Sequence, residues 1–132
     1  MAWLQHIGLT TSNLKLSEKF YVENFGFKTI VEKEISARLM QEIFGYNSPA
    51  QLIFLKAEKG QEIELFHFPE LKEAIPQIGK ISHFTLAVDD HVKYFEKLKN
   101  SGCETIAAKK EDGGMVYFVK DPDGNLIELR DE

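Results

Sequence analysis

The chain has 132 residues, 43% of them hydrophobic, with a formal net charge of −5 and a single cysteine. This length suits one compact domain, or two small halves that share a core, and the composition excludes a disordered chain. The acidic balance argues against nucleic acid as a partner, and Cys103 has no second cysteine for an intrachain disulfide. No apolar segment approaches the roughly 20 residues that a membrane helix needs, and no signal peptide is evident, so we expect a cytoplasmic protein.

The first half of the chain predicts a strand, a helix and three further strands, with one extra short helix. Ser12 and Asn13 provide an N-cap for the first helix, whose apolar residues keep helical spacing up to about Asn24, and Gly26 ends it. The extra helix is expected at 36–44. The strands of this half are expected at 3–11, 27–34, 51–57 and 61–68.

The same plan restarts after a predicted linker at 69–80, within a single domain that we expect to span 1–132. Asp89 and Asp90 provide the cap of the second long helix, and the segment DPDG at 121–124 predicts a hairpin turn. We therefore expect two modules, about 3–68 and about 81–130, the second with a helix at 91–101 and strands at 81–88, 103–108, 115–120 and 125–130.

The two modules also share a piece of sequence. Residues 51–65 read QLIFLKAEKGQEIEL, and residues 115–129 read MVYFVKDPDGNLIEL. At one constant offset, six residues of the first copy recur in the second: Phe54, Lys56, Gly60, Ile63, Glu64 and Leu65 fall on Phe118, Lys120, Gly124, Ile127, Glu128 and Leu129. A second similarity precedes each copy, since LQHIGL at 4–9 resembles ISHFTL at 81–86. Each module therefore offers one early histidine and one late glutamate.

The spacing along the strands places these four polar residues on one kind of face. Side chains alternate between the two faces of a strand, so each histidine and each glutamate points away from its apolar neighbours. Because the helix of each module must cover the apolar face, His6, Glu64, His83 and Glu128 are expected on the opposite, concave side. Any one of them alone is more simply a solvated residue. The four together, in duplicated positions, indicate a metal site.

The donor set restricts the metal. Two neutral imidazoles and two carboxylates together carry a charge of about −2, which matches a divalent cation. Mixed nitrogen and oxygen donors suit nickel, cobalt, zinc, manganese or ferrous iron, and the absence of thiolate argues against a structural zinc site. Four protein ligands leave two positions of an octahedral ion open for water or substrate. We therefore expect a catalytic site that holds one of these five ions: nickel, cobalt, zinc, iron or manganese.

Three segments of the chain together resemble the vicinal oxygen chelate superfamily, and especially its glyoxalase I-like proteins: HIGLTTSNLKLSEKFYVENFGFKTI, ISHFTLAVDD and YFVKDPDGNLIEL. The resemblance covers nearly the whole chain. It implies an α+β fold in which two tandem βαβββ modules form an open mixed β-barrel around a divalent metal. It also implies a homodimer, and it implies ligands from the first and last strands of each module, which here are His6, Glu64, His83 and Glu128.

The resemblance implies a chemistry as well. A glyoxalase I-like lyase or isomerase acts on a small oxygenated substrate of the hemithioacetal type, whose oxygens the metal polarises so that an enediolate is stabilised. A ligating carboxylate then moves a proton between adjacent carbons. Glu128 is the first choice for this base, with Glu64 as its partner.

Three positions bear on which substrate is bound. Similar proteins that use glutathione usually carry an arginine where this chain has Thr10 and an asparagine where it has Phe68. Both departures argue against glutathione recognition in the standard manner. Arg38, in the extra segment 36–46, is the candidate for binding an anionic substrate, although an exposed helix arginine is the commoner outcome.

Two alternatives stay open. Ring-cleaving extradiol dioxygenases of the same fold use two histidines and one glutamate around ferrous iron, so Glu64 counts against that activity. The other alternative is a non-catalytic small-molecule binding or antibiotic-resistance protein. Such a protein would usually have lost the ligands, and all four are present here.

Overall fold

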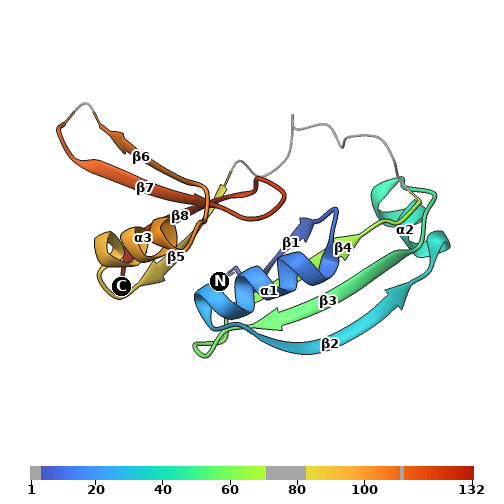
Figure 1. Cartoon of the computed structure of the whole chain (residues 1–132). Helices are drawn as coiled ribbons and strands as arrows, with labels where there is room; N and C mark the ends of the chain where they lie inside the picture. Colours follow the sequence, from blue (N-terminus) through green and yellow to red (C-terminus); the bar gives the residue numbers. More distant parts are fainter. Residues whose placement is uncertain (1–3, 71–82, 111) are drawn as a thin grey trace. The chain divides into compact units, whose positions relative to one another are not determined.

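The computed structural model describes residues 4–70, 83–110 and 112–132. By its internal contacts the chain divides into two compact units, Met1–Ile75 and Pro76–Glu132. The described elements of the first unit are β1 (His6–Thr10), α1 (Leu14–Phe25), β2 (Lys28–Ile35), α2 (Ala37–Phe44), β3 (Ala50–Lys56) and β4 (Glu62–His67) (Figure 1). Those of the second unit are β5 (His83–Val88), α3 (His91–Asn100), β6 (Thr105–Lys109), β7 (Met115–Lys120) and β8 (Leu126–Asp131).

Each unit contains one four-stranded sheet, and the two sheets have the same topology. The strand orders are β1-β4-β3-β2 and β5-β8-β7-β6. In both sheets the first and last strands of the unit pair in parallel, and the other neighbours are antiparallel. The predicted order of strand, helix and three strands is therefore present twice, with α2 inserted between β2 and β3. The α+β class predicted from the sequence is confirmed.

Capping side chains begin the helices where the sequence predicts them. Asn13, Ser36 and Asp90 each accept a hydrogen bond from the backbone N–H three residues further on. Such a bond satisfies one of the donors that the first turn of a helix leaves free. At the other end of α1, Gly26 has a φ of 71°, a left-handed conformation that glycine adopts without strain.

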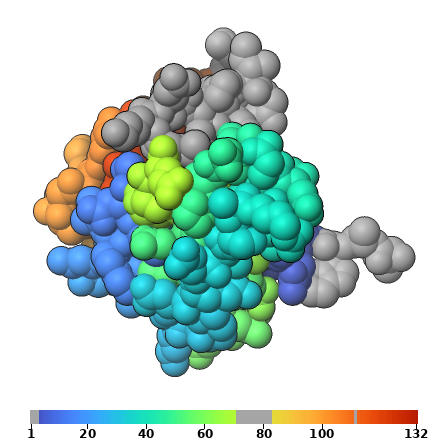
Figure 2. Space-filling view, turned by 90° about the vertical axis from the view of Figure 1, so that its right-hand side faces the viewer, coloured from blue at the N-terminus to red at the C-terminus, as the bar shows by residue number. Residues whose placement is uncertain are grey.

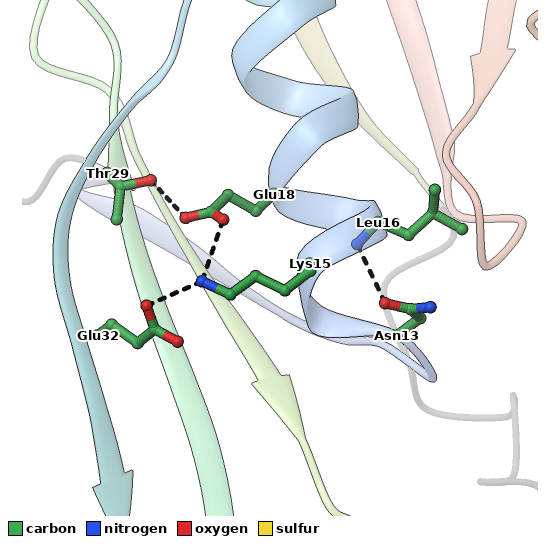
Figure 3. Close-up of polar contacts among 6 residues, drawn as sticks. All are labelled: Asn13, Lys15, Leu16, Glu18, Thr29 and Glu32. Atoms are coloured by element: carbon green, nitrogen blue, oxygen red, sulfur yellow. Dashed lines mark hydrogen bonds and ion pairs between the residues drawn. The ribbon is translucent and has the colours of Figure 1, made fainter.

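Polar contacts on the surface tie the first turn of α1 to β2 (Figure 3). The Lys15 ammonium lies 2.9 Å from a Glu32 carboxylate oxygen and 3.4 Å from a Glu18 oxygen. Thr29 donates a hydrogen bond of 2.6 Å to the other oxygen of Glu18. Because Lys15 is largely exposed, these pairs add little to stability, and their main effect is to orient the helix on the sheet.

The core of each unit lies between its sheet and its long helix. In the first unit α1 contacts β2, β3 and β4, and in the second α3 contacts all four strands (Figure 1). The largest fully buried side chains of the first unit are Tyr21, Ile53, Leu55 and Leu65, and those of the second are Leu98, Val119, Ile127 and Leu129. No helix in the described ranges is long and apolar enough to span a bilayer.

Most of the described element boundaries differ from the predicted ones by one or two residues. The strand predicted at 103–108 begins at Thr105 and ends at Lys109, and the one predicted at 27–34 is Lys28–Ile35. Most of the predicted linker at 69–80, like the first residues of the strand at 81–88, lies outside the described residues.

Two histidine–glutamate half-sites

The first unit brings His6 and Glu64 together on neighbouring parallel strands. In the pairing of β1 with β4, Gly8 is the partner of Glu64, which places His6 two residues earlier on the same face. The Nε2 atom of His6 lies 3.7 Å from Oε2 of Glu64. Phe54 is the β3 partner of Glu64, and its ring meets the His6 ring edge-on, with 6.2 Å between the two ring centroids. These three residues form the first half-site.

The second imidazole nitrogen of His6 also has a partner. His6 Nδ1 lies 2.6 Å from the side-chain oxygen of Gln5. Because an amide oxygen only accepts hydrogen bonds, this contact requires a proton on Nδ1, and in the neutral ring the lone pair is then on Nε2, the nitrogen that faces Glu64. A histidine oriented in this way by its second nitrogen is prepared to bind a metal through Nε2.

The second unit repeats the arrangement. Thr85 on β5 is the pairing partner of Glu128 on β8, and His83 again lies two residues earlier. His83 Nε2 is 3.5 Å from Oε2 of Glu128, and Phe118, the β7 partner of Glu128, meets the histidine ring edge-on at 5.6 Å. His83, Glu128 and Phe118 form the second half-site, in which every residue corresponds to one of the first.

Glu128 has two further partners. Arg130 donates a hydrogen bond of 2.8 Å from Nε to Oε1, and the Thr85 hydroxyl donates one of 3.3 Å to Oε2. Burial of Glu128, a residue that is 8% exposed, acts to raise the pKa of its carboxyl. The hydrogen bond and positive charge of Arg130, together with Thr85, outweigh burial and hold the pKa below its ordinary value of 4.5. Glu128 is therefore a carboxylate at neutral pH.

Burial along β1, β4 and β5 follows the predicted alternation, whereas in β8 Glu128 is buried like its two neighbours. Ile63 and Leu65 are buried on either side of Glu64, and Ile127 and Leu129 are buried on either side of Glu128. On the first strand of each unit, the histidine is exposed. The apolar residues therefore fill the core, and the histidine and glutamate occupy the other face of each sheet.

The donor atoms of each half-site suit two neighbouring ligands of one ion. Metal bonds to nitrogen and oxygen of about 2.0–2.2 Å place neighbouring donors about 3.0 Å apart at an octahedral angle and about 3.4 Å apart at a tetrahedral one. The observed separations of 3.7 Å and 3.5 Å are close to these values. Within the described residues, no group of three or more His, Cys, Asp or Glu side chains is gathered for a metal, and each half-site supplies two donors.

The residues expected to select the substrate make their recorded contacts outside the first half-site. Thr10 is an exposed residue of β1, and Phe68 is 5% exposed in a core cluster with Met40. Arg38 projects from α2, which forms part of the surface (blue-green in Figure 2), and its Nη1 binds both carboxylate oxygens of Glu42 at 3.0 Å and 3.1 Å. Within the described part of the first unit, no hydrogen bond, ion pair or ring contact joins any of the three to His6 or Glu64.

The structure adds residues that the sequence predictions did not assign. Arg130 lies two positions after Glu128 and therefore shares its face, so alternation alone could have indicated it. Phe54 and Phe118 belong to the repeated sequence, and each lies beside the histidine of its half-site. Nothing in the sequence indicated Gln5, because its contact with His6 Nδ1 depends on how the histidine ring is oriented.

The fold and the paired half-sites define an α+β protein of two βαβββ modules, each of which carries one histidine–glutamate pair. The chain belongs to the Glyoxalase/Bleomycin resistance protein/Dioxygenase superfamily, whose family model matches residues 3–129. This match confirms the predicted resemblance.

Individual proteins with similar sequence or structure agree with this membership. The uncharacterized protein YwkD of Bacillus subtilis is 26% identical over 98% of this chain and 96% of its own length. The trypanothione-dependent glyoxalase I of Leishmania major has a TM-score of 0.71 with 21% identity, over 100% of this chain and 88% of its own. The Listeria monocytogenes fosfomycin resistance protein FosX, as a mutant with Mn(II) and a dihydroxypropylphosphonic acid, has a TM-score of 0.68 with 19% identity, over 100% and 94% of the two chains. At these identities the two structures establish the fold alone.

Proposed function

We propose that the chain is a metal-dependent enzyme of the glyoxalase I type, a lyase or isomerase that acts on a small oxygenated substrate. The observation that carries the proposal is the recurrence of one histidine–glutamate pair in both units, with donor atoms 3.7 Å and 3.5 Å apart. Membership of a superfamily that includes glyoxalases supports it.

The proposed ligands of one divalent ion are His6, Glu64, His83 and Glu128. Nickel, cobalt and zinc are the first candidates for this donor set, with iron and manganese as alternatives. The Mn(II) held by the Listeria protein keeps manganese among them. An ion bound at these residues would polarise two neighbouring oxygens of the substrate.

The two glutamates supply the proton transfer that an isomerisation needs. A carboxylate beside a C–H bond next to a carbonyl can accept the proton and return it to the adjacent carbon. Glu128 and Glu64 are the two candidates for this base. Phe54 and Phe118 each cover one edge of a histidine, and such apolar surface favours the exclusion of water from the reaction.

The substrate proposed here is a hemithioacetal-type compound of a thiol other than glutathione. Thr10 carries no charge, and Phe68 is 5% exposed in its aromatic cluster, so neither offers an ionic contact to a glutathione carboxylate. Arg38 is the candidate for binding an anionic group of the substrate. That group would replace Glu42 as the partner of the Arg38 guanidinium. The trypanothione-dependent Leishmania enzyme supports testing a range of thiols.

Metal content and activity together test the proposal. Protein purified without chelator is expected to hold nickel, cobalt or zinc at about one ion per chain and to isomerise the methylglyoxal adduct of at least one thiol. Glu64→Gln and Glu128→Gln are each expected to lower kcat/KM at least about 100-fold. Glu104→Gln, an exposed carboxylate change on the second unit, serves as the control. Full metal occupancy and unchanged activity in both variants would overturn the ligand assignment.

The same preparation separates the alternatives. Iron with oxygen uptake on a panel of catechols would instead establish the dioxygenase. Tight binding of small molecules without metal or turnover would establish a binding or resistance protein.

A homodimer is also proposed, together with a cytoplasmic location, and sedimentation of the purified chain is expected to give twice the mass of 15.1 kDa.

A further inference from the structure

The three residues of each half-site are of the same types, but two positions next to the glutamate differ between the units. Each has a histidine, a glutamate and a phenylalanine in corresponding positions of corresponding strands. The strand partner of the glutamate is Gly8 in the first unit and Thr85 in the second. Two residues after the glutamate, on the same face, stand Phe66 in the first unit and Arg130 in the second.

These two differences give Glu128 a set of hydrogen bonds that no described residue makes to Glu64. Arg130 and Thr85 donate to the two oxygens of Glu128 at 2.8 Å and 3.3 Å. Neither Gly8 nor Phe66 has a side-chain donor. Among the described residues, the polar contact recorded for the Glu64 carboxylate is His6. The Glu64 side chain is also the more exposed of the two, at 22% against 10%.

In the first half-site an aromatic ring lies beside Gly8, the residue that corresponds to Thr85. The Phe66 ring lies over Gly8, so that a Cβ atom added at Gly8 would meet it at 3.4 Å. Phe66 is held there by Phe44 and Phe68, whose rings lie 5.8 Å and 6.3 Å away. An aromatic surface therefore replaces the donors beside Glu64, and the asymmetry is part of the packing of the first unit.

The asymmetry separates the roles of the two carboxylates. A glutamate that carries a proton between carbons must rotate away from the metal, whereas a permanent ligand must stay. Charge-assisted hydrogen bonds are about twice as strong as neutral ones, so rotation of Glu128 requires the Arg130 bond to break. No described residue makes such a bond to Glu64, so its rotation breaks none within that part of the chain.

We propose that Arg130 is a positioning residue that holds Glu128 as the fixed ligand, and that Glu64 is the catalytic carboxylate. This inference rests on the proposed function and reverses the order of the two bases expected from the resemblance. Glu64 accepts the proton of the carbon that bears the hydroxyl and delivers it to the neighbouring carbonyl carbon, while the hydroxyl proton passes to the neighbouring oxygen. One C–H and one O–H bond break and one of each forms, so the isomerisation needs no oxidant or reductant.

Metal affinity tests the positioning role without any turnover. Nickel chloride is titrated into the chelator-treated full chain by calorimetry, with Arg130→Gln, Arg130→Lys and Lys120→Gln as variants. Loss of a residue that orients a metal ligand typically weakens binding about 10- to 100-fold, and this is expected for Arg130→Gln. Arg130→Lys is expected to recover part of the loss. Lys120→Gln removes a comparable surface ion pair, with Glu104 at 2.8 Å, and is expected to bind nickel like the wild type.

Two glutamate variants test the division of roles. Glu128→Gln is expected to weaken nickel binding more than Glu64→Gln does, and to change the visible spectrum of the cobalt-loaded protein more strongly. Glu64→Gln is expected to lower kcat more than it lowers nickel affinity. Circular dichroism and thermal melting of every variant check that the fold is retained, and Arg130, whose side chain is 61% exposed, is expected to be replaceable without unfolding.

The outcomes distinguish this inference from the proposed function. A wild-type chain that binds no nickel, cobalt, zinc, iron or manganese overturns both. If the wild type binds nickel and Arg130→Gln binds it within about twofold of the wild type, Arg130 has no positioning role and only the inference fails. Equal losses of nickel affinity in Glu64→Gln and Glu128→Gln would also overturn the division of roles while leaving the ligand set intact.

Discussion

Asp131 connects the last strand to the first residue of α3. One of its carboxylate oxygens accepts a hydrogen bond of 2.8 Å from the His91 backbone N–H, and His91 Nδ1 lies 2.8 Å from the same oxygen. The backbone hydrogen bond and then the side-chain contact lower the pKa of Asp131 below its ordinary value of 3.8. Because the pKa is lower in the folded state, this contribution to stability is complete well above pH 3.8 and is lost as the pH falls through the folded-state pKa.

Asp131→Asn is accordingly expected to lower the free energy of unfolding near pH 6, with the difference from the wild type shrinking below pH 3.8. Urea unfolding at a series of pH values measures both effects. Asp89→Asn, at an exposed position of the loop before α3, is the control. A difference that stays constant down to pH 2 would contradict the role assigned to the ionised carboxylate.

Single residues also show where sequence reasoning about the site succeeds. Strand alternation is a property of the backbone, so it correctly placed His6 and Glu64 on the face opposite Ile63 and Leu65. The contact of Arg130 with Glu128 depends instead on the rotamers of two flexible side chains, which alternation does not determine. The assignment of all four ligands to one ion stays a prediction.

At the scale of elements, the N-cap of α1 offers a direct test. The Asn13 side-chain oxygen accepts a hydrogen bond of 3.1 Å from the Leu16 backbone N–H (Figure 3). Asn13→Ala removes this acceptor and is expected to cost about 1 kcal/mol of unfolding free energy. For a chain of this size, that loss lowers Tm by roughly 3–6 °C, which calorimetry or circular dichroism can measure.

A second substitution at the same position controls for the size of the side chain. Asn13→Asp keeps an oxygen in the capping position, and aspartate is about as good an N-cap as asparagine. This variant is therefore expected to melt within about 1–2 °C of the wild type. Equal destabilisation by alanine and aspartate would mean that the hydrogen bond to Leu16 is not the source of the effect.

The elements themselves were largely predictable because their signals are local. Capping residues, glycines and apolar periodicity lie within a few residues of each boundary. They correctly predicted all the described helices and strands. The ends shift because strand pairing, not composition, decides where a ladder stops. Thr105 begins β6 as the partner of Val119 on β7, which the sequence of 103–108 does not reveal.

At the scale of the whole molecule, one question is how the two half-sites use metal. A ligand that binds only the folded state adds about 2.7 kcal/mol of stability at 100 times its Kd. Nickel at that excess is therefore expected to raise Tm by roughly 8–16 °C. The same nickel added with excess chelator is the control and is expected to leave Tm unchanged.

The stoichiometry and the combination of variants decide whether both units serve one ion. If His6 and His83 bind the same ion, nickel saturates at about one per chain, and His6→Ala or His83→Ala alone removes most of the rise in Tm. The double variant then loses little more than either single one, because residues that act on one site are strongly non-additive. If each pair binds its own ion, saturation comes at about two per chain and the two losses add. That second result would rule out a four-ligand site and leave two weak pairs, each with too few protein ligands for the chemistry proposed here.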